Sequence, residues 1–201
     1  MSLTVFFTRH GETEWNIEKR MQGRLNSPLT NKGKQDALKL GQRLAQTKFT
    51  KVFSSPSGRA LETAQIITGG EAIVKDERLM EIMLGEWQGK TEEEIWAHDP
   101  LLFAQYWQHP HEYDNPYGES FQNVIDRMRD FLAELALTTS GNVLVVTHGV
   151  ALRAIYSICR MLPVHQFWNG APDIEGTSLT ILTYESQQFQ IVKEACTAHC
   201  Q

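Results

Sequence analysis

The sequence predicts an α/β fold, a three-layer α/β/α sandwich with a mostly parallel central sheet and a helical insertion over one of its edges. Apolar runs at residues 3–7, 52–53 and 143–146 each end in a polar turn, and helical stretches follow them. Strands that alternate with helices along a chain form parallel sheets with helices on both faces. A chain of 201 residues can build one substantial core, so we expect one domain over residues 1–201.

Composition and charge narrow the class of protein. Hydrophobic residues make up 41% and charged residues 21% of the chain, as in soluble globular proteins. The net charge of −5 argues against a nucleic-acid partner. No apolar run reaches the roughly eighteen residues that span a membrane, so we expect no membrane partner. The N-terminus lacks the basic and apolar regions of a secretion signal, and we therefore expect a cytoplasmic protein.

The first strand ends in an arginine, a histidine and a glycine. Thr8-Arg9-His10-Gly11 follows the apolar residues 3–7, and open α/β sheets bind ligands at the carboxyl ends of their strands. Arginine offers a fixed fork of donors to phosphate, and neutral histidine can present one ring nitrogen as a nucleophile or base. Glycine lets the backbone approach closely. Taken alone, three such residues are more typical of a surface turn than of a site.

The next stretch predicts a loop, a helix and a second strand. Residues 15–29 are polar and carry glycine, proline and asparagine, which is typical of a loop. Thr30 is a good N-cap for a helix that ends near Thr47. The short strand at residues 52–53 is followed by a helix over residues 60–67. This order places Arg59 in the first turn of a helix that follows a strand.

The predicted position of Arg59 is unfavourable for a cation. The N-terminus of a helix favours negative charge, so an arginine there needs compensation. A bound anion, shared between the guanidinium and the free backbone N–H groups, would supply it. The alternative is a surface arginine that bridges to Glu62 or Glu81.

Two carboxylates follow a predicted third strand at residues 73–74. Glu81 lies among apolar residues, and burial would raise its pKa and make it a candidate proton donor. The alternative is a solvated carboxylate in a turn. Glu86 lies between Gly85 and Trp87 in a stretch that predicts an exposed turn, which makes it the weaker candidate.

Residues 91–126 differ in composition from the rest of the chain. They contain no lysine or arginine, but they gather acidic residues and many aromatic ones: Trp96, Phe103, Tyr106, Trp107, Tyr113, Tyr117 and Phe121. Residues 101–107 predict an amphipathic helix, and residues 109–118 an irregular connection. We expect this insertion, about residues 91–126, to act as a substrate-selecting cap. The alternative is that the aromatic residues fill a satellite core.

The last part of the chain ends a strand in the same way as the first. A helical stripe over residues 124–135 precedes the strand at 143–146, which ends in Thr147-His148-Gly149 and leads into a helix over 150–156. Residues 177–184 predict a further strand, with residues 189–192 as its antiparallel neighbour.

Parallel strands end at the same edge of a sheet, so the chemically active side chains should converge there: Arg9, His10, Arg59, Glu81 and His148. Such a set suits a dianionic tetrahedral group, because phosphoryl transfer needs mainly positioning and charge neutralisation. The sequence holds no aspartate-rich cluster for a two-metal site, no Gly-x-x-x-x-Gly-Lys loop and no Cys-x5-Arg loop. The remaining route is attack by a histidine nitrogen, followed by hydrolysis of the phosphohistidine.

The same residues form four motifs in order along nearly the whole chain. These are Arg9-His10-Gly11-Glu12-Thr13 through Asn16, Ser54-Ser55-Pro56 through Thr63-Ala64, Glu81 ahead of Gly85-x-Trp87-x-Gly89, and Thr147-His148-Gly149. Together they resemble the histidine phosphatase superfamily, the phosphoglycerate-mutase-like group. Within it, the chain most resembles the bacterial broad-specificity phosphatases of the phosphatase branch, in Met21-Gln22-Gly23, residues 57–64 and Gly176-Thr177-Ser178.

The resemblance implies that His10 is phosphorylated and that no metal or other cofactor takes part. The phosphoryl group would be held by Arg9, Arg59 and His148. Glu81 would protonate the leaving oxygen and then activate water. Family positions that line the phosphate pocket match Thr13, Asn16, Gln22 and Gly23. We expect Gly11 to help fix His10 by leaving a backbone carbonyl free to accept the Nδ1 proton, which leaves Nε2 as the nucleophile.

We therefore expect a phosphoric monoester hydrolase of the histidine acid type, with a small-molecule phosphomonoester as substrate and inorganic phosphate as product. Phosphoglycerate mutases resemble the chain in its motifs but carry a longer, basic insertion where this chain has acids and aromatic residues. We therefore expect a broad or aromatic-leaning substrate range. A phosphoglycerate mutase, an α-ribazole phosphatase and a phosphoryl-binding module without turnover stay open as alternatives, as does an oligomeric assembly.

Three cysteines, Cys159, Cys196 and Cys200, are an odd number in a chain without an export signal, which predicts reduced thiols. Cys196, His199 and Cys200 also have the side chains of a metal site. Three ligands near a terminus make this the less favoured interpretation. We expect no metal at His109 and His111, because no carboxylate or cysteine cluster accompanies them in the sequence.

Overall fold

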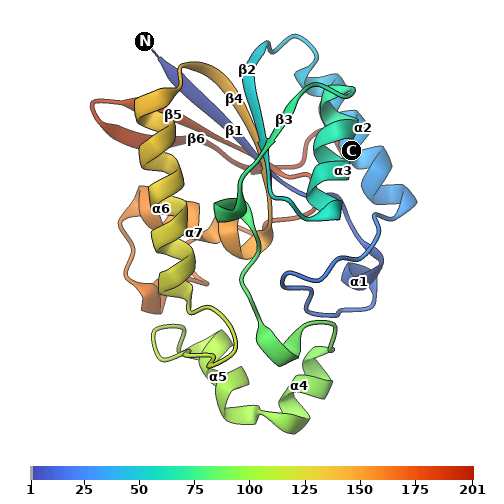
Figure 1. The fold of residues 1–201 in the computed structure, drawn as a ribbon, viewed down its shortest axis with the longest axis vertical. Coiled ribbons are helices and arrows are strands. Elements are labelled where there is room, and N and C mark those ends of the chain that lie inside the picture. The colour runs from blue at the N-terminus through green and yellow to red at the C-terminus, as the bar shows by residue number, and fades with distance from the viewer. Residues whose placement is uncertain (1) are drawn as a thin grey trace.

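The structure, a computed structural model, describes residues 2–201 and contains a six-stranded sheet in the order β3-β2-β4-β1-β5-β6 (Figure 1). The parallel strands are β1 (Leu3–Arg9), β2 (Phe49–Ser54), β3 (Ile73–Lys75) and β4 (Gly141–Thr147). The antiparallel strands at one edge are β5 (Leu179–Glu185) and β6 (Gln188–Cys196). Each predicted strand is present, and the predicted antiparallel pairing of the last two is confirmed.

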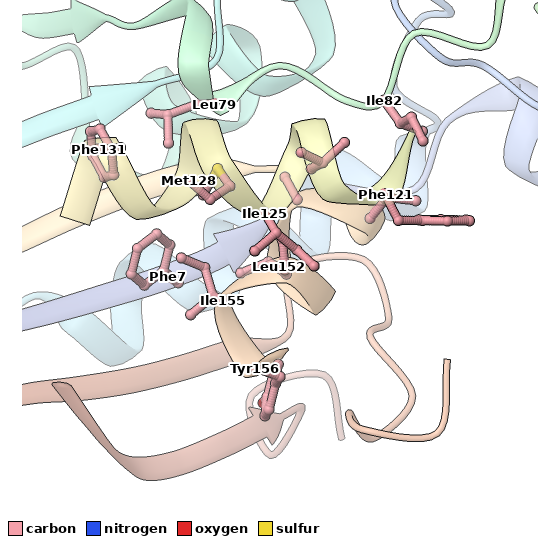
Figure 2. Close-up of a cluster of buried hydrophobic side chains, with 14 of the residues drawn as sticks. Phe7, Leu79, Ile82, Phe121, Ile125, Met128, Phe131, Leu152, Ile155 and Tyr156 are labelled. Carbon is pink, nitrogen blue, oxygen red and sulfur yellow. The ribbon is translucent and has the colours of Figure 1, made fainter. Parts of the chain in front are cut away.

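Two pairs of helices cover the two faces of the sheet (Figure 1). One face packs against α2 (Asn31–Leu44) and α3 (Gly58–Thr68), and the other against α6 (Phe121–Thr138) and α7 (Gly149–Arg160). Figure 2 shows the second core, in which Phe7 of β1 lies with Met128 of α6 and Ile155 of α7. The mixed α/β fold with a mostly parallel sheet is thereby confirmed.

The central strand β4 explains why two separate cores form. Val143 and Val145 belong to the core with α6 and α7, whereas Leu144 and Val146 belong to the core with α2 and α3. Successive side chains of a strand point to opposite faces, so a continuous apolar run is buried on both sides. Burial of each such side chain contributes about 1.5–3 kcal/mol.

Smaller elements lie beyond the carboxyl ends of the parallel strands (Figure 1). They are α1 (Glu14–Ile17), α4 (Glu92–His98), α5 (Pro100–Gln108) and the 3-10 helices η1 (Glu77–Leu79), η2 (Gly85–Trp87) and η3 (Val164–Gln166). The helix predicted over residues 101–107 is confirmed as α5. The loop predicted for residues 15–29 is wrong at its start, because α1 forms there. A capping box between Thr13 and Asn16 stabilises the N-terminus of this helix. Within residues 2–201, no helix has the length and apolar character needed to cross a membrane.

Candidate active site

The two His-Gly sequences lie side by side at the carboxyl edge of the sheet. In the parallel pairing of β1 and β4, Arg9 is the register partner of Thr147. The His10 N–H donates to the Thr147 carbonyl at 2.9 Å, and the rings of His10 and His148 have centroids 5.2 Å apart. The strand register therefore joins two motifs that are far apart in sequence.

The His10 side chain is buried and held in one orientation. Its Nδ1 donates to the Gly11 carbonyl oxygen at 2.8 Å, so the backbone carbonyl that we expected to accept this proton is that of Gly11 itself. The other ring nitrogen, Nε2, then carries a lone pair. Gly11 also packs closely against α2, since a Cβ at this position would lie 2.6 Å from the Gly33 carbonyl oxygen. A larger residue than glycine would therefore displace the loop that orients His10.

Arg59 lies in the first turn of α3, as predicted, and is only 1% exposed. It binds the loop before α2, because Nη1 donates to the Leu25 carbonyl at 2.6 Å and Nη2 to the Gly23 carbonyl at 2.8 Å. The predicted alternative, a surface bridge to Glu62, is wrong, since Glu62 pairs with Lys34 at 2.9 Å. Nor does Arg59 form a salt bridge with Glu81 in the part of the chain that the structure describes.

His148 is fully buried behind this arginine. Arg59 Nη2 donates to His148 Nδ1 at 3.1 Å, and His148 Nε2 lies 2.8 Å from the Ser55 hydroxyl. Because Nδ1 accepts a hydrogen bond from the guanidinium, the imidazole is neutral and Nε2 is the donor. Both ring nitrogens are thus occupied, and His148 does not line the cavity beside His10 and Arg59 that is described below.

Arg9 and Glu81 both lie close to Gly149 at the start of α7, since a Cβ there would be 3.8 Å from Arg9 Nε and from Glu81 Oε2. Arg9 Nη1 donates to the Ile174 carbonyl at 2.8 Å. Glu81 is half-buried, and its two oxygens accept the backbone N–H groups of Ile82 at 3.0 Å and Val150 at 3.1 Å. The Val150 N–H is one of the free donors at the N-terminus of α7. Glu81 is therefore neither fully buried nor a solvated turn residue, and Glu86 is exposed as predicted.

These groups surround a cavity of about 150 Å³, which we call the catalytic cavity. Its lining residues are Arg9, His10, Asn16, Arg20, Met21, Gln22, Gly23, Arg59, Glu81, Ile82, Leu84, Tyr106 and Val150. Among residues 2–201, Arg9 Nε and Arg59 Nε are buried without a hydrogen-bond partner. Burial lowers the pKa of Arg59 to about 10 and also lowers that of Arg9. A buried and a half-buried cation with unused donors suit this cavity to an anion.

Among the predicted pocket residues, Thr13 has a different place from the others. It is fully buried and does not line the cavity. Its hydroxyl accepts from Gln22 Nε2 at 2.8 Å and donates to Asn16 Oδ1 at 2.9 Å. Thr13 thus orients two cavity residues, and the Nδ2 group of Asn16 is left for a ligand.

Sequence reasoning missed several lining residues, above all Arg20, Met21, Tyr106 and Val150. Arg20 and Met21 directly precede Gln22, and Val150 follows Gly149, so proximity to the motifs was the available signal. Tyr106 had no signal that set it apart from the other aromatic residues of its segment.

Most aromatic residues of residues 91–126 pack against one another. Tyr106, Tyr113 and Phe121 are at most 2% exposed. The rings of Tyr113 and Phe121 each have centroids 5.0 Å from that of Tyr106. Tyr106 is the one aromatic residue of this segment that lines the catalytic cavity, and its burial raises the pKa of its hydroxyl. The satellite core, which we gave as the alternative, accounts for most of the others.

The metal interpretation of the C-terminal residues finds no support. Within residues 2–201 there is no group of three or more His, Cys, Asp and Glu side chains that could hold a metal ion. Between Cys196 and His199 lies the guanidinium of Arg43, at 3.3 Å from Cys196 Sγ and from His199 Nδ1.

Comparison with known proteins agrees with the geometry. The model of the histidine phosphatase superfamily, branch 1, matches residues 5–197. The chain belongs to this superfamily. It is 31% identical to phosphoserine phosphatase 1 of Hydrogenobacter thermophilus, over 97% of this chain and 93% of that protein. It is 38% identical to the probable phosphoglycerate mutase GpmB of Salmonella choleraesuis, over 80% and 76% of the two chains.

The superfamily fold extends over the whole chain. YhfR of Bacillus stearothermophilus has a solved structure that superimposes with a TM-score of 0.94, at 42% identity, over 99% of this chain and 100% of that one. The protein is thus an enzyme of the phosphatase and mutase type that the superfamily comprises.

The buried histidines of this superfamily member predict a pH-dependent stability. Burial, together with Arg59, holds the pKa of His10 and His148 well below the ordinary value. Below about pH 6.5 the unfolded chain therefore binds more protons, so the free energy of unfolding should fall as pH drops from about 7 to 5. Each histidine contributes at most about 1.4 kcal/mol per pH unit, and the contribution is complete above the unfolded pKa.

Urea denaturation at about pH 7.5 and 5.5 measures this effect. We expect the fall in unfolding free energy to be smaller in His10→Ala than in the unchanged chain, because one buried histidine no longer titrates on unfolding. His165→Ala is the control, since His165 is exposed. An unchanged pH slope in His10→Ala would show that His10 is not held neutral.

Proposed function

We propose that this chain is a metal-independent phosphomonoester hydrolase that works through a phosphohistidine at His10. One observation carries the proposal: Nδ1 of His10 is bound to the Gly11 carbonyl at 2.8 Å, in a cavity that Arg9 and Arg59 also line. That contact leaves Nε2 as an unprotonated nucleophile, and the arginines neutralise the charge of a phosphoryl group.

The reaction has two displacements at phosphorus. His10 Nε2 attacks, the bond from phosphorus to the ester oxygen breaks, and Glu81 gives its proton to the departing alcohol. Glu81 then takes a proton from water, the water oxygen attacks phosphorus, and the N–P bond breaks to release inorganic phosphate. Glu81 lines the same cavity as His10, which supports this assignment.

The proposed phosphate ligands fall into those that line the catalytic cavity and one, His148, that lies behind Arg59. Arg9, Arg59, Asn16, Gln22 and Gly23 line the cavity and can contact the phosphoryl oxygens directly. His148 holds Arg59 Nη2 through its Nδ1 in this structure. When that guanidinium donates to phosphate, the ring proton can move to Nδ1 while Nε2 accepts from the Ser55 hydroxyl. His148 can then donate from Nδ1 to the phosphoryl group as well.

The leaving group has room in a second cavity. About 480 Å³ in volume, it shares Asn16, Arg20 and Met21 with the catalytic cavity, and Trp15 lines it. A tryptophan and a methionine present apolar surface to the organic part of a substrate. This supports a broad or aromatic-leaning range, chosen by residues near Trp15 and the start of α4 more than by the aromatic residues of α5.

The mutase alternative is favoured by the 38% identity to a probable phosphoglycerate mutase. Against it, residues 91–126 supply no cation. The second cavity is lined by Lys19 and Arg20 but also by Glu18, Glu92 and Glu93, so its lining has no excess of positive charge. A small polyanion such as phosphoglycerate would leave charge unpaired there. Phosphoserine and α-ribazole phosphate remain candidate substrates within the hydrolase proposal.

A panel of phosphomonoesters tests the proposal. We expect release of phosphate from an aryl phosphate at an undiminished rate in the presence of a chelator, and slower release from phosphoserine and 3-phosphoglycerate. Conversion of 3- to 2-phosphoglycerate faster than hydrolysis would overturn the hydrolase assignment. A rate that disappears with the chelator and returns with a metal would overturn the metal-independent one.

A further inference from the structure

A cluster of sulfur-bearing and polar side chains lies at the C-terminal end of the chain, outside the catalytic cavity. Cys196 is the last residue of β6. A turn follows, which a hydrogen bond from the Cys200 N–H to the Thr197 carbonyl closes at 2.8 Å. Cys200 follows Cys196 by four residues across this turn, and both cysteines are free and partly exposed.

The Cys196 thiol lies against a cation. Nη1 and Nη2 of Arg43, in the last turn of α2, are each 3.3 Å from Cys196 Sγ. A guanidinium at this distance stabilises the thiolate, which is the form that reacts with electrophiles. Hydrogen bonds from the Ala198 backbone and from Arg43 lower the pKa of Cys196.

Cys159 provides a comparison within the same chain. It lies on α7, and burial raises its pKa to about 12. A thiol of this kind is protonated at neutral pH and reacts slowly. The chain therefore holds one thiol that its surroundings activate and one that they suppress.

We propose that Cys196 is a peroxide-reactive thiol and that Cys200 is its resolving partner. The Cys196 thiolate attacks one oxygen of hydrogen peroxide, the S–O bond forms, the O–O bond breaks, and the departing hydroxide takes a proton to become water. The Cys200 sulfur then attacks the sulfenic acid, the S–S bond forms, the S–O bond breaks, and the hydroxide leaves as water with the Cys200 proton. The two thiols lose two electrons, and peroxide is reduced to water.

The turn also contacts the structure that holds the catalytic strand. The Thr177 hydroxyl lies 3.2 Å from His199 Nε2 and 3.7 Å from Cys200 Sγ, and the Thr177 N–H donates to the Arg9 carbonyl at 3.0 Å. Thr177 is fully buried with a φ of 58°, a conformation that costs a β-branched residue energy. Its contacts keep it in place.

A disulfide between Cys196 and Cys200 would therefore change contacts next to the active site. Drawing Cys200 Sγ to Cys196 breaks its contact with Thr177. Cys200 also lines a cavity of about 340 Å³ together with Arg9 and Asn16, which both line the catalytic cavity as well. We infer that oxidation loosens the Thr177 backbone and lowers the catalytic rate.

Mass spectrometry of the full chain after peroxide treatment tests the chemistry. Trypsin cuts after Lys193 and releases residues 194–201, which contain both cysteines. We expect this peptide to lose two hydrogens while Cys159 stays open to alkylation. In Cys200→Ser, oxidation should stop at a sulfenic acid on Cys196 that dimedone traps. Oxidation of Cys159 as fast as Cys196 would overturn the proposal.

Two arginine variants test the role of the cation. Arg43→Ala should slow the oxidation of Cys196 severalfold, because the thiolate loses its two donors. Arg129→Ala is the matched control, since that exposed arginine of α6 pairs with Asp126 at 2.7 Å. Equal oxidation rates in the two variants would exclude activation by Arg43.

Hydrogen exchange at the Thr177 amide and the rate with an aryl phosphate test the coupling. In the oxidised chain we expect faster exchange of this amide and a severalfold lower hydrolysis rate. Dithiothreitol should reverse both changes, and neither change should occur in Cys196→Ser. A disulfide without these changes would overturn the coupling. The rate readout rests on the proposed hydrolase function, whereas the mass and exchange readouts do not. A reduced chain without hydrolysis would therefore count against that function alone.

Discussion

Replacing His10 by alanine should abolish phosphomonoester hydrolysis, with a rate lower by about 10⁴-fold or more. His10 is 3% exposed, and its Nδ1 is bound to the Gly11 carbonyl, so Nε2 is the nucleophile of the proposed reaction. Steady-state release of phosphate from an aryl phosphate measures the loss. Without this nitrogen no covalent intermediate can form, and binding of the substrate by the arginines alone leaves little catalysis.

His165→Ala is the control for this prediction, because His165 is exposed and does not line the cavity. Rapid quench of the unchanged chain with a labelled substrate should trap an acid-labile phosphohistidine, and the same experiment on His10→Ala should trap none. A rate for His10→Ala within tenfold of the unchanged chain would exclude His10 as the nucleophile.

Replacing Arg59 by alanine should lower the catalytic rate by about 10²–10³-fold, because a buried donor and its charge are lost from the cavity. The variant should also be less stable. The carbonyls of Gly23 and Leu25 and His148 Nδ1 lose their donor in the folded chain. Each buried group left without a partner lowers the free energy of unfolding by about 1–3 kcal/mol. Removal of the buried cation offsets part of this loss, because its charge no longer has to be desolvated.

Urea denaturation and the phosphatase rate at full folding separate the two effects of Arg59→Ala. Arg127→Ala is the matched control. Arg127 is a mostly buried arginine whose Nε lies 3.0 Å from Glu119 Oε1, and neither residue lines the catalytic cavity. It should be destabilised while its rate changes little. A folded Arg59→Ala protein with a rate within threefold of the unchanged chain would remove Arg59 from the proposed machinery.

The secondary structure could be predicted because its signals are local. The apolar run of β4 and the Thr30 cap of α2 each lie within one short stretch of sequence. The helix α1 was missed because its local signal is too short. A helix of four residues has too few positions for a periodic pattern, and it depends on the capping box of Thr13 and Asn16.

The candidate site could be predicted in part. The position of Arg59 at the start of α3 followed from the alternation of strand and helix, and so did the meeting of His10 and His148. The roles of neighbours did not follow, because a side chain's direction depends on what packs around it. Thr13 matched a pocket position by motif, yet its hydroxyl binds Asn16 and Gln22.

By itself, the sequence determined the fold class, the superfamily and the set of side chains at the carboxyl edge of the sheet, since these depend on residue order and local periodicity. Only the tertiary structure decided which groups touch. In it, Arg59 donates a hydrogen bond to His148, and Tyr113 and Phe121 pack against Tyr106. The C-terminal turn contacts Thr177 through His199. The physical reason is that such contacts join residues far apart in the chain, and their distances are set by the packing of layers and loops.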